Sequence, residues 1–299
     1  MALLKPGIAL ALASAALFSI NTPIASYGQS IGNDALVFAF VRGVSTALVS
    51  GAIAILFGAS FRVPRKHWPA MAVMVIAISL QGMFYLSSVG YIPVGLAALL
   101  FYMHPILVVL ITTVLKQGTT ATIGQWMCFL TAFFGLALAL GPELGGLDWR
   151  GIFLAFGAAL MVAIYLVATR SSIGDVSFLA LSVYGSAGTA VFSFLAIYGL
   201  HRSLEPISAT LATWPAVAIA LVFPAAFLVQ LAALKRIETK TLAIVFNIEP
   251  LLSIAIAAIF LNELLTVTQM IGAVVVVAAL SGYARLSRNP VKRVGSPST

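Results

Sequence analysis

The feature that most constrains this chain is a series of ten apolar segments, each about as long as a membrane-spanning helix. A helix needs about 20 apolar residues to cross the hydrocarbon core of a bilayer. The whole chain is 62% hydrophobic and 8% charged, whereas soluble domains carry about 45–50% apolar and about 25% charged residues. An ordinary soluble enzyme, a disordered chain and a disulfide-rich secreted fold are therefore excluded. The segments cover residues 7–26, 35–57, 69–88, 94–115, 123–140, 151–169, 178–200, 215–234, 241–261 and 267–283.

These segments predict an all-α polytopic membrane protein with ten transmembrane helices, because lipid offers no partner to the backbone groups of an open strand. The net charge of +8 could suggest nucleic-acid binding, but the basic residues alternate with the apolar segments and form no single patch. Thirteen of the 16 Lys and Arg residues fall in the two termini and the even-numbered connections; only Arg150 and Arg202 fall on the other side, and Arg42 lies inside the second segment. By the positive-inside rule we expect both termini in the cytoplasm.

Short matches between the two halves indicate an internal repeat. They recur in the same order at offsets of 142 to 146 residues. Since each half holds five segments, the second copy would enter the membrane upside down, which is an architecture of transporters with a midplane site between the halves. We therefore predict a first repeat at 1–146, an inverted repeat at 147–285 and a disordered cytoplasmic tail at 286–299. The matches pair Gly7 with Gly151, Ser30 with Ser172, Trp68 with Trp214, His104-Pro105 with Glu249-Pro250, and Gln125 with Gln269.

Several of these residues also resemble a known family. Glu249-Pro250, followed by Asn262-Glu263-Leu264, Thr266, Gln269 and Gly272, resembles the close of an EamA repeat in the drug/metabolite transporter superfamily. The first half carries the related run 85–90 and the Arg-bearing stretch 39–42, but it has Lys116-Gln117-Gly118 where the second half has Asn262-Glu263. Within the superfamily the chain looks most like the bacterial YddG-type exporters of aromatic amino acids. The resemblance implies ten helices, cytoplasmic termini, a bacterial inner-membrane location and outward movement of a small metabolite without ATP.

His104 and Glu249 are the first candidates for a binding site. Each lies near the middle of a span, directly before a proline, at matching positions of the two halves. Pro105 and Pro250 cannot supply the amides that would bond to the carbonyls of residues 101 and 246, so those carbonyls could face a cavity or water. His104 and Glu249 either bind substrate or exchange protons at the midplane, or form a structural hydrogen bond between the halves.

Other polar and aromatic side chains inside the spans are further candidates, because a polar group at bilayer depth needs a partner or water. Gln81 and Tyr85 share a helix face, as do Met161 and Tyr165, and flat or soft walls suit an aromatic substrate; packing is the alternative, and for Met161 the favoured one. Arg42 either attracts a carboxylate, snorkels outward or pairs within the bundle. The remaining candidates are Tyr102, Asn247 and Asn21 for substrate and Pro23, Pro105, Pro224 and Pro250 for helix kinks; for Asn21, hydrogen bonding between helices is the alternative.

These features predict a secondary transporter or facilitator, not an enzyme, that exports aromatic and other neutral amino acids by alternating access. The alternatives are a proton-coupled exporter of other metabolites or cationic drugs and, more distantly, a membrane enzyme acting on lipid-linked substrates. The sequence has no Walker-type loop for ATP, and we expect no cofactor, no metal and no nucleic-acid partner, only a small-molecule substrate and the lipid bilayer. Small residues at Gly43, Ala47 and Gly51 permit close helix contact; we expect them inside a monomer, with a dimer as the alternative.

Overall fold

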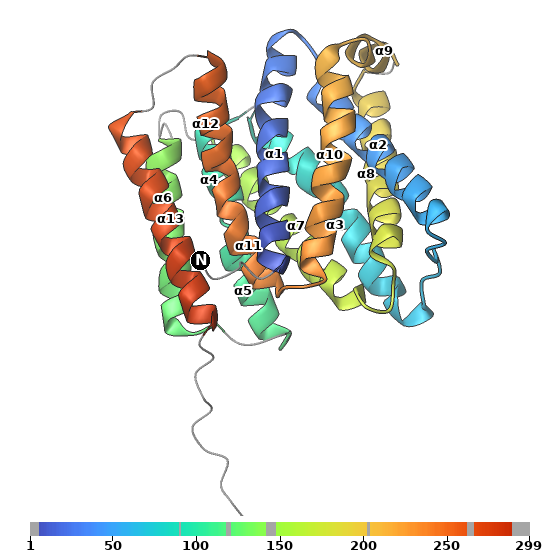
Figure 1. The fold of residues 1–299 in the computed structure, drawn as a ribbon. Coiled ribbons are helices and arrows are strands. Elements are labelled where there is room, and N and C mark those ends of the chain that lie inside the picture. Colours follow the sequence, from blue (N-terminus) through green and yellow to red (C-terminus); the bar gives the residue numbers. More distant parts are fainter. Residues whose placement is uncertain are drawn as a thin grey trace, which may run out of the picture.

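The fold is a bundle of long helices (Figure 1). A computed structural model of the chain describes residues 6–89, 91–117, 121–141, 148–201, 204–261 and 266–288, and in these ranges it contains helices and one isolated bridge between Ile173 and Val176. Ten stretches of the described helices are long and apolar enough to cross a membrane. The predicted fold class and number of spans are therefore confirmed. The predicted tail lies outside the described residues from 289 onward, and residues 286–288 belong to the last helix.

The helices match the predicted segments to within a few residues at each end. The first half contains α1 (Pro6–Ser30), α2 (Ala35–Leu56), the short η1 (Arg65–His67), α3 (Trp68–Val89), α4 (Val94–Phe101), α5 (His104–Val114) and α6 (Ile123–Leu140). The second half contains α7 (Trp149–Ser172), α8 (Phe178–His201), α9 (Glu205–Leu211), α10 (Trp214–Leu234), α11 (Thr239–Val245), η2 (Phe246–Ile248), α12 (Glu249–Leu261) and α13 (Val267–Arg288).

Matched capping residues start the last span of each half. The Thr122 hydroxyl accepts a hydrogen bond from the Gln125 amide at 3.3 Å, and the Gln125 side chain accepts one from the Thr122 amide at 3.1 Å. Thr266 and Gln269 make the same two bonds at 3.2 and 2.9 Å at the start of α13. This capping box satisfies orphan amides of the first turn. It gives a physical reason for the sequence match between Gln125 and Gln269.

The fourth and ninth spans are broken rather than merely kinked. α4 ends at Phe101 and α5 begins at His104, which puts Pro105 in the first turn of a new helix. α12 likewise begins at Glu249, with Pro250 next. Proline is well tolerated in a first turn, where its missing amide would have no partner in any case. Pro23 and Pro224, in contrast, lie inside the continuous helices α1 and α10.

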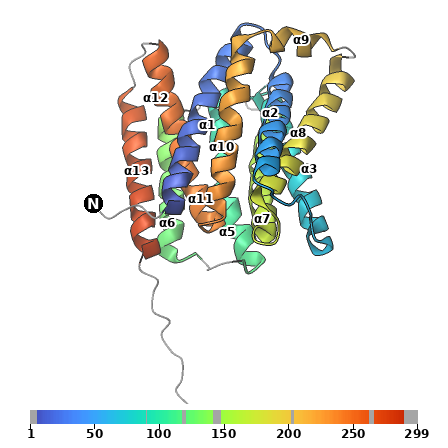
Figure 2. The ribbon, with the colours of Figure 1, turned by 45° about the vertical axis from the view of Figure 1, so that its right-hand side comes forward.

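The packing of the helices follows the predicted repeat. α1 packs along α10 and α3 along α7, while α2 packs along α8 and α6 along α13 (Figures 1 and 2). In the predicted repeat, α1 corresponds to α7 and α3 to α10, so the α1–α10 contact corresponds to the α3–α7 contact. The α2–α8 and α6–α13 contacts each join a span to its own counterpart. An inverted repeat would produce this pattern. The division into repeats at residue 146 remains a prediction that the pattern favours.

Small residues and interhelical hydrogen bonds hold the helices together within the chain. A Cβ atom on Gly43 of α2 would lie 2.6 Å from the backbone nitrogen of Ala190 in α8, so these two backbones are in close contact. The Ser14 hydroxyl donates to the Ala226 carbonyl at 2.8 Å, joining α1 to α10. Without a hydrophobic force between helices in lipid, such packing and hydrogen bonds stabilise the bundle. The small residue Gly43 is thus used inside the chain, as expected.

One end of the bundle, which we call the basic face, carries most of the positive charge. α1 begins and α13 ends there (Figure 1). Lys66 and His67 bind the Asp175 carboxylate, with the His67 Nε2 atom at 2.8 Å, and so join the α2–α3 connection to the α7–α8 connection. Hydrogen bonds from Lys66 and then His67 hold the pKa of Asp175 below its usual value. This stabilisation is present at neutral pH and is lost as the pH falls through the lowered pKa.

We predict that Gly43→Val lowers the thermal stability of the detergent-solubilised protein. The new side chain would meet backbone atoms of α8 that cannot move aside, and such overpacking costs about 1–3 kcal/mol. Gly199→Val is the matched control, because a Cβ at Gly199 meets nothing within 4 Å. Equal melting temperatures for the two variants would contradict the close contact of α2 and α8.

We also predict that the basic face lies in the cytoplasm. In a Cys128→Ser background, a cysteine replacing Ser296 should be closed to an impermeant thiol reagent in intact cells. Tyr91→Cys is the control on the opposite face, where the native side chain is 45% exposed, and it should react. Labelling at position 296 in unbroken cells would show that the orientation is opposite to the predicted one.

Candidate functional site

Two opposite charges from the two halves of the bundle interact electrostatically. Glu249, the first residue of α12, interacts electrostatically with the Arg42 guanidinium of α2 and with the Tyr102 hydroxyl. The Arg42 guanidinium also lies over the Phe223 ring of α10, 5.1 Å from its centroid. Arg42 therefore turns into the bundle and does not snorkel outward. Since charges inside a membrane are rare and face a partner or a water-filled space, this pair marks a candidate site.

Aromatic rings form a wall beside these charges. Tyr85 of α3 packs against Phe101 with ring centroids 5.1 Å apart. The His104 ring contacts both Phe101 and Tyr102, at 5.6 and 5.9 Å. Tyr85 also lies close enough to Glu249 to interact with its charge. Phe101, Tyr102 and His104 at the break between α4 and α5 and Tyr85 of α3 therefore form one aromatic cluster, whose two tyrosines interact with the carboxylate.

His104 also closes the helix break. Its Nδ1 atom lies 3.2 Å from the Phe101 carbonyl oxygen. A carbonyl can only accept, so this contact assigns the proton to Nδ1 and leaves Nε2 as an acceptor. In the other broken span the Phe246 carbonyl accepts the backbone amide of Glu249. The carbonyls freed by the two prolines thus have internal donors, in place of the cavity or water that sequence reasoning suggested.

Two buried asparagines carry oxygens without partners in the described part of the chain. Asn21 on α1 and Asn247 in η2 are 3% and 2% exposed, and the Oδ1 atom of each has no hydrogen-bond donor. The Asn21 Nδ2 atom donates to the Leu17 carbonyl at 3.2 Å. Because a buried acceptor without a donor costs about 1–3 kcal/mol, both oxygens are candidates to receive a donor from a ligand or a water.

Tyr165 and Met161 belong to the apolar core and not to the charged cluster. The Tyr165 hydroxyl donates to the Gln230 side chain at 3.2 Å, and its ring stacks on Phe227 at 6.2 Å. Met161 packs against the same hydrophobic cluster, as the packing alternative stated. Gln81 lies one turn before Tyr85 on α3 and is partly buried.

Phe223, like the Phe101 ring, is a site residue that the sequence analysis missed. It contacts Arg42, packs edge-on against Phe18 at 5.3 Å and stacks on Phe227 at 6.2 Å. As one of 19 phenylalanines it carries no distinctive chemistry. Its position directly before Pro224, inside a span, was the available signal.

Comparison with known proteins identifies the family of the chain. The family model of the EamA-like transporter family matches residues 5–141 and again residues 149–284. The chain belongs to this family. It is 26% identical over 231 residues to the threonine/homoserine exporter RhtA of Escherichia coli K12, covering 74% of each chain. It is 25% identical over 283 residues to the uncharacterized transporter YvbV of Bacillus subtilis, covering 88% of this chain and 87% of that one.

The fold is also found in a solved structure. A crystal structure superposes with a TM-score of 0.80 over 95% of this chain and 99% of the other, at 20% sequence identity. The match to the EamA-like transporter family model confirms the family resemblance inferred from the sequence. The relatives named here do not confirm the finer resemblance to YddG-type exporters of aromatic amino acids. That resemblance stays a prediction.

We predict that His104→Ala impairs transport more than it impairs stability. Loss of the ring leaves the Phe101 carbonyl without this donor, which lowers the free energy of unfolding by about 1 kcal/mol. It also removes a side chain that packs against Phe101 and Tyr102 of the aromatic wall. His104→Asn keeps a donor near the Nδ1 position, so it should recover most of the stability and little of the transport. The measurements are melting in detergent and counterflow in proteoliposomes. A His104→Ala protein that is less stable and yet transports like the wild type would make His104 purely structural.

Proposed function

We propose that the protein is a facilitator in the bacterial inner membrane that exports neutral amino acids. The observation that carries this proposal is the electrostatic interaction of Arg42 with Glu249 beside an aromatic wall. The carboxylate of an amino acid would bind Arg42 and its ammonium group would bind Glu249. Each charge of the site then finds an opposite charge on the substrate, so the zwitterion enters without leaving a buried charge uncompensated.

The helix breaks support the same orientation of substrate. α5 and α12 both begin at the site, and helix N-termini favour negative charge. In transporters, half-helix N-termini of this kind point at anionic substrate groups. The carboxylate would therefore lie near the start of α5 and the Arg42 guanidinium, and the unpartnered oxygens of Asn21 and Asn247 would accept donors from substrate or bound water.

The aromatic wall of Tyr85, Phe101 and Tyr102 favours an aromatic or otherwise flat side chain on the substrate. The second candidate class is small hydroxyl-bearing amino acids, because the relatives include threonine/homoserine exporters. Both classes are neutral and present the same headgroup. A cationic drug suits the site less well, because Arg42 would repel it, and family membership supports a transporter over the membrane enzyme considered above.

We infer that the site is exposed to each side in turn by movement of the half-helices. The breaks at Tyr102–Met103 and at η2 let α4 and α5, or α11 and α12, move separately without bending a continuous helix. The two halves would then rock around the fixed site, as expected of inverted repeats. One chain supplies Arg42, Glu249 and the aromatic wall, so we propose a functional monomer.

We propose that transport is not coupled to protons. Glu249 is the only acidic residue well inside a predicted span, and proton pathways usually need several polar stations. Its carboxylate faces the positive charge of Arg42. Glu249 is therefore assigned to substrate binding.

Counterflow in proteoliposomes tests this function. We expect exchange of labelled phenylalanine, with tryptophan, threonine and homoserine as competitors that rank the two substrate classes. Glu249→Gln should reduce the rate by about tenfold or more, since a hydrogen bond to a charged group is worth about 1.5–3 kcal/mol. Glu205→Gln, at the exposed start of α9, is the control and should exchange like the wild type. An imposed pH step should drive no accumulation; uphill uptake that is lost in Glu249→Gln would make the protein proton-coupled.

A further inference from the structure

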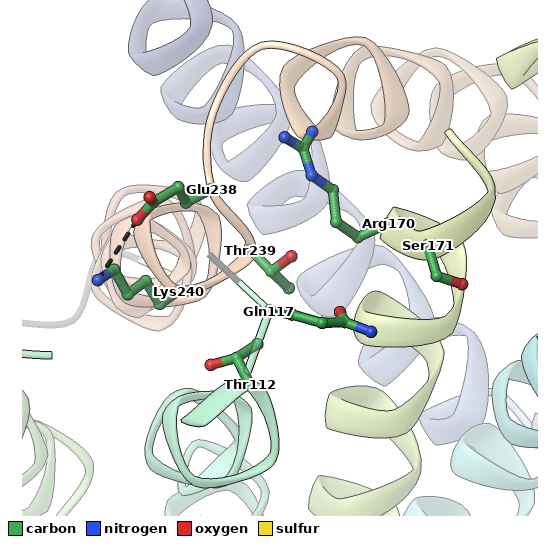
Figure 3. A pocket seen from close by; sticks show the side chains of 7 residues that line it. All are labelled: Thr112, Gln117, Arg170, Ser171, Glu238, Thr239 and Lys240. Carbon is green, nitrogen blue, oxygen red and sulfur yellow. Dashed lines mark ion pairs between the residues drawn. The ribbon is translucent and has the colours of Figure 1, made fainter. Parts of the chain in front are cut away.

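A polar pocket opens at the basic face, apart from the candidate site. Its volume is about 390 Å³, and it lies between the end of α5, the end of α7 and the start of α11 (Figure 3). α5 and α11 are the half-helices that lead to His104 and Glu249. Thr112 in the pocket is eight residues from His104, which is about 12 Å along a helix. Pocket and site therefore lie along the same two broken spans.

An apolar layer separates the pocket from the site. Val108 of α5, Leu242 and Val245 of α11 and Phe246 of η2 are all buried and belong to one hydrophobic cluster. Along the helices these residues lie between the pocket and the residues His104, Asn247 and Glu249. α5 and α11 pack directly against each other here. The path from the basic face to the site is therefore closed in this structure, with a polar pocket outside the closure.

The pocket contains charged groups and one acceptor without a partner. Arg170 donates to the Leu234 carbonyl at the end of α10, and Lys240 pairs with Glu238 at 3.4 Å. A guanidinium has five N–H donors, so one bond does not exhaust it. The Gln117 side chain extends from the end of α5 toward α7, below Arg170 (Figure 3), and its buried Oε1 atom has no donor in the described chain. These groups suit a ligand that carries both an anion and an N–H donor.

A signal for membrane topology does not explain these charges. Such a signal needs only exposed basic residues, as at Lys66, whose side chain is 68% exposed, whereas the Lys240 side chain is 5% exposed. The repeat does not explain them either. The positions matched to Arg170, Glu238 and Lys240 by the local offsets are occupied by glycine, proline and glycine, at 28, 93 and 95. The charged pocket is specific to the basic face.

We propose that this pocket is a docking site for the zwitterionic headgroup of the transported amino acid on the cytoplasmic side. The substrate carboxylate binds Arg170 in the positive field of Lys240, and the ammonium group donates to Gln117 Oε1 and faces Glu238. Opening of the α5–α11 contact then lets the amino acid pass the apolar layer to Arg42 and Glu249. This inference rests on the proposed function, since it takes the same ligand.

The test is protection of an introduced cysteine in the full-length protein. Ser171 lines the pocket and is exposed, so Ser171→Cys in a Cys128→Ser background should react with a thiol reagent in detergent solution. Phenylalanine or threonine should slow this reaction, also when Glu249→Gln has disabled the central site. Gln117→Leu should raise the concentration for half-protection about fivefold, the effect of one hydrogen bond of about 1 kcal/mol. Ser60→Cys, exposed on the same face outside the pocket, is the control and should be unaffected.

The outcomes separate this site from the proposed function. A protein that exchanges amino acids but shows no protection at position 171 has no docking site there. Protection that disappears with Glu249→Gln and persists with Gln117→Leu would come from a conformational change at the central site, and would also overturn the proposal. If the wild type neither binds nor exchanges any amino acid, the proposed function fails first and the docking site fails with it.

Discussion

Compensation of charge inside the membrane is the constraint on which the site depends. A single Arg or acidic side chain at the centre of a spanning helix costs about 2.5–3.5 kcal/mol on insertion scales. Arg42 stands on a helix of the first half and Glu249 on a helix of the second, and the two charges attract each other. The Phe223 ring adds a cation–π contact with Arg42, and the Tyr102 hydroxyl interacts with Glu249. The two halves must therefore pack together before either charge is acceptable, and this ties the fold of the bundle to the formation of its site.

The broken spans place functional groups at bilayer depth while keeping the backbone bonded. Each break ends one helix and starts another at a polar residue followed by proline, His104-Pro105 and Glu249-Pro250. The carbonyl oxygens that lose a backbone donor to proline accept hydrogen bonds from the His104 ring and from the Glu249 amide. In a continuous helix, the interior backbone groups would all form hydrogen bonds within the helix. The breaks start α5 and α12 inside the spans; in the proposed function, the start of α5 stabilises the substrate carboxylate and Glu249 at the start of α12 binds the ammonium group.

The sequence alone predicted the features that depend on hydropathy and on the order of residues along the chain. The ten spans and the family follow from the apolar segments and from residues such as Glu249-Pro250. Side-chain direction does not follow from these patterns. Hydropathy could not show that Arg42 turns inward, or that the Tyr165 hydroxyl donates a hydrogen bond to Gln230 within the core.

Contacts between distant helices were equally out of reach. Phe223 matters because α10 brings it beneath Arg42, and Gln117 because α5 ends beside α7. In the sequence, Gln117 stood out only as a departure from the family pattern. Its contribution to a pocket depends on the ends of α5, α7 and α11 coming together, which is a property of the folded bundle.

The most direct test of the central claim compares one amino acid with its two truncated forms. For phenylalanine these are phenethylamine, which lacks the carboxylate, and 3-phenylpropionate, which lacks the ammonium group. The dissociation constants of all three ligands are measured on the purified wild type and on the Arg42→Gln and Glu249→Gln variants. If Arg42 and Glu249 hold the two ends of a zwitterion, the wild type binds both analogues about 10-fold or more weakly than phenylalanine. Arg42→Gln should then lose discrimination against phenethylamine alone, and Glu249→Gln against 3-phenylpropionate alone. Equal binding of all three ligands by the wild type, or the same loss in both variants, would contradict the assignment.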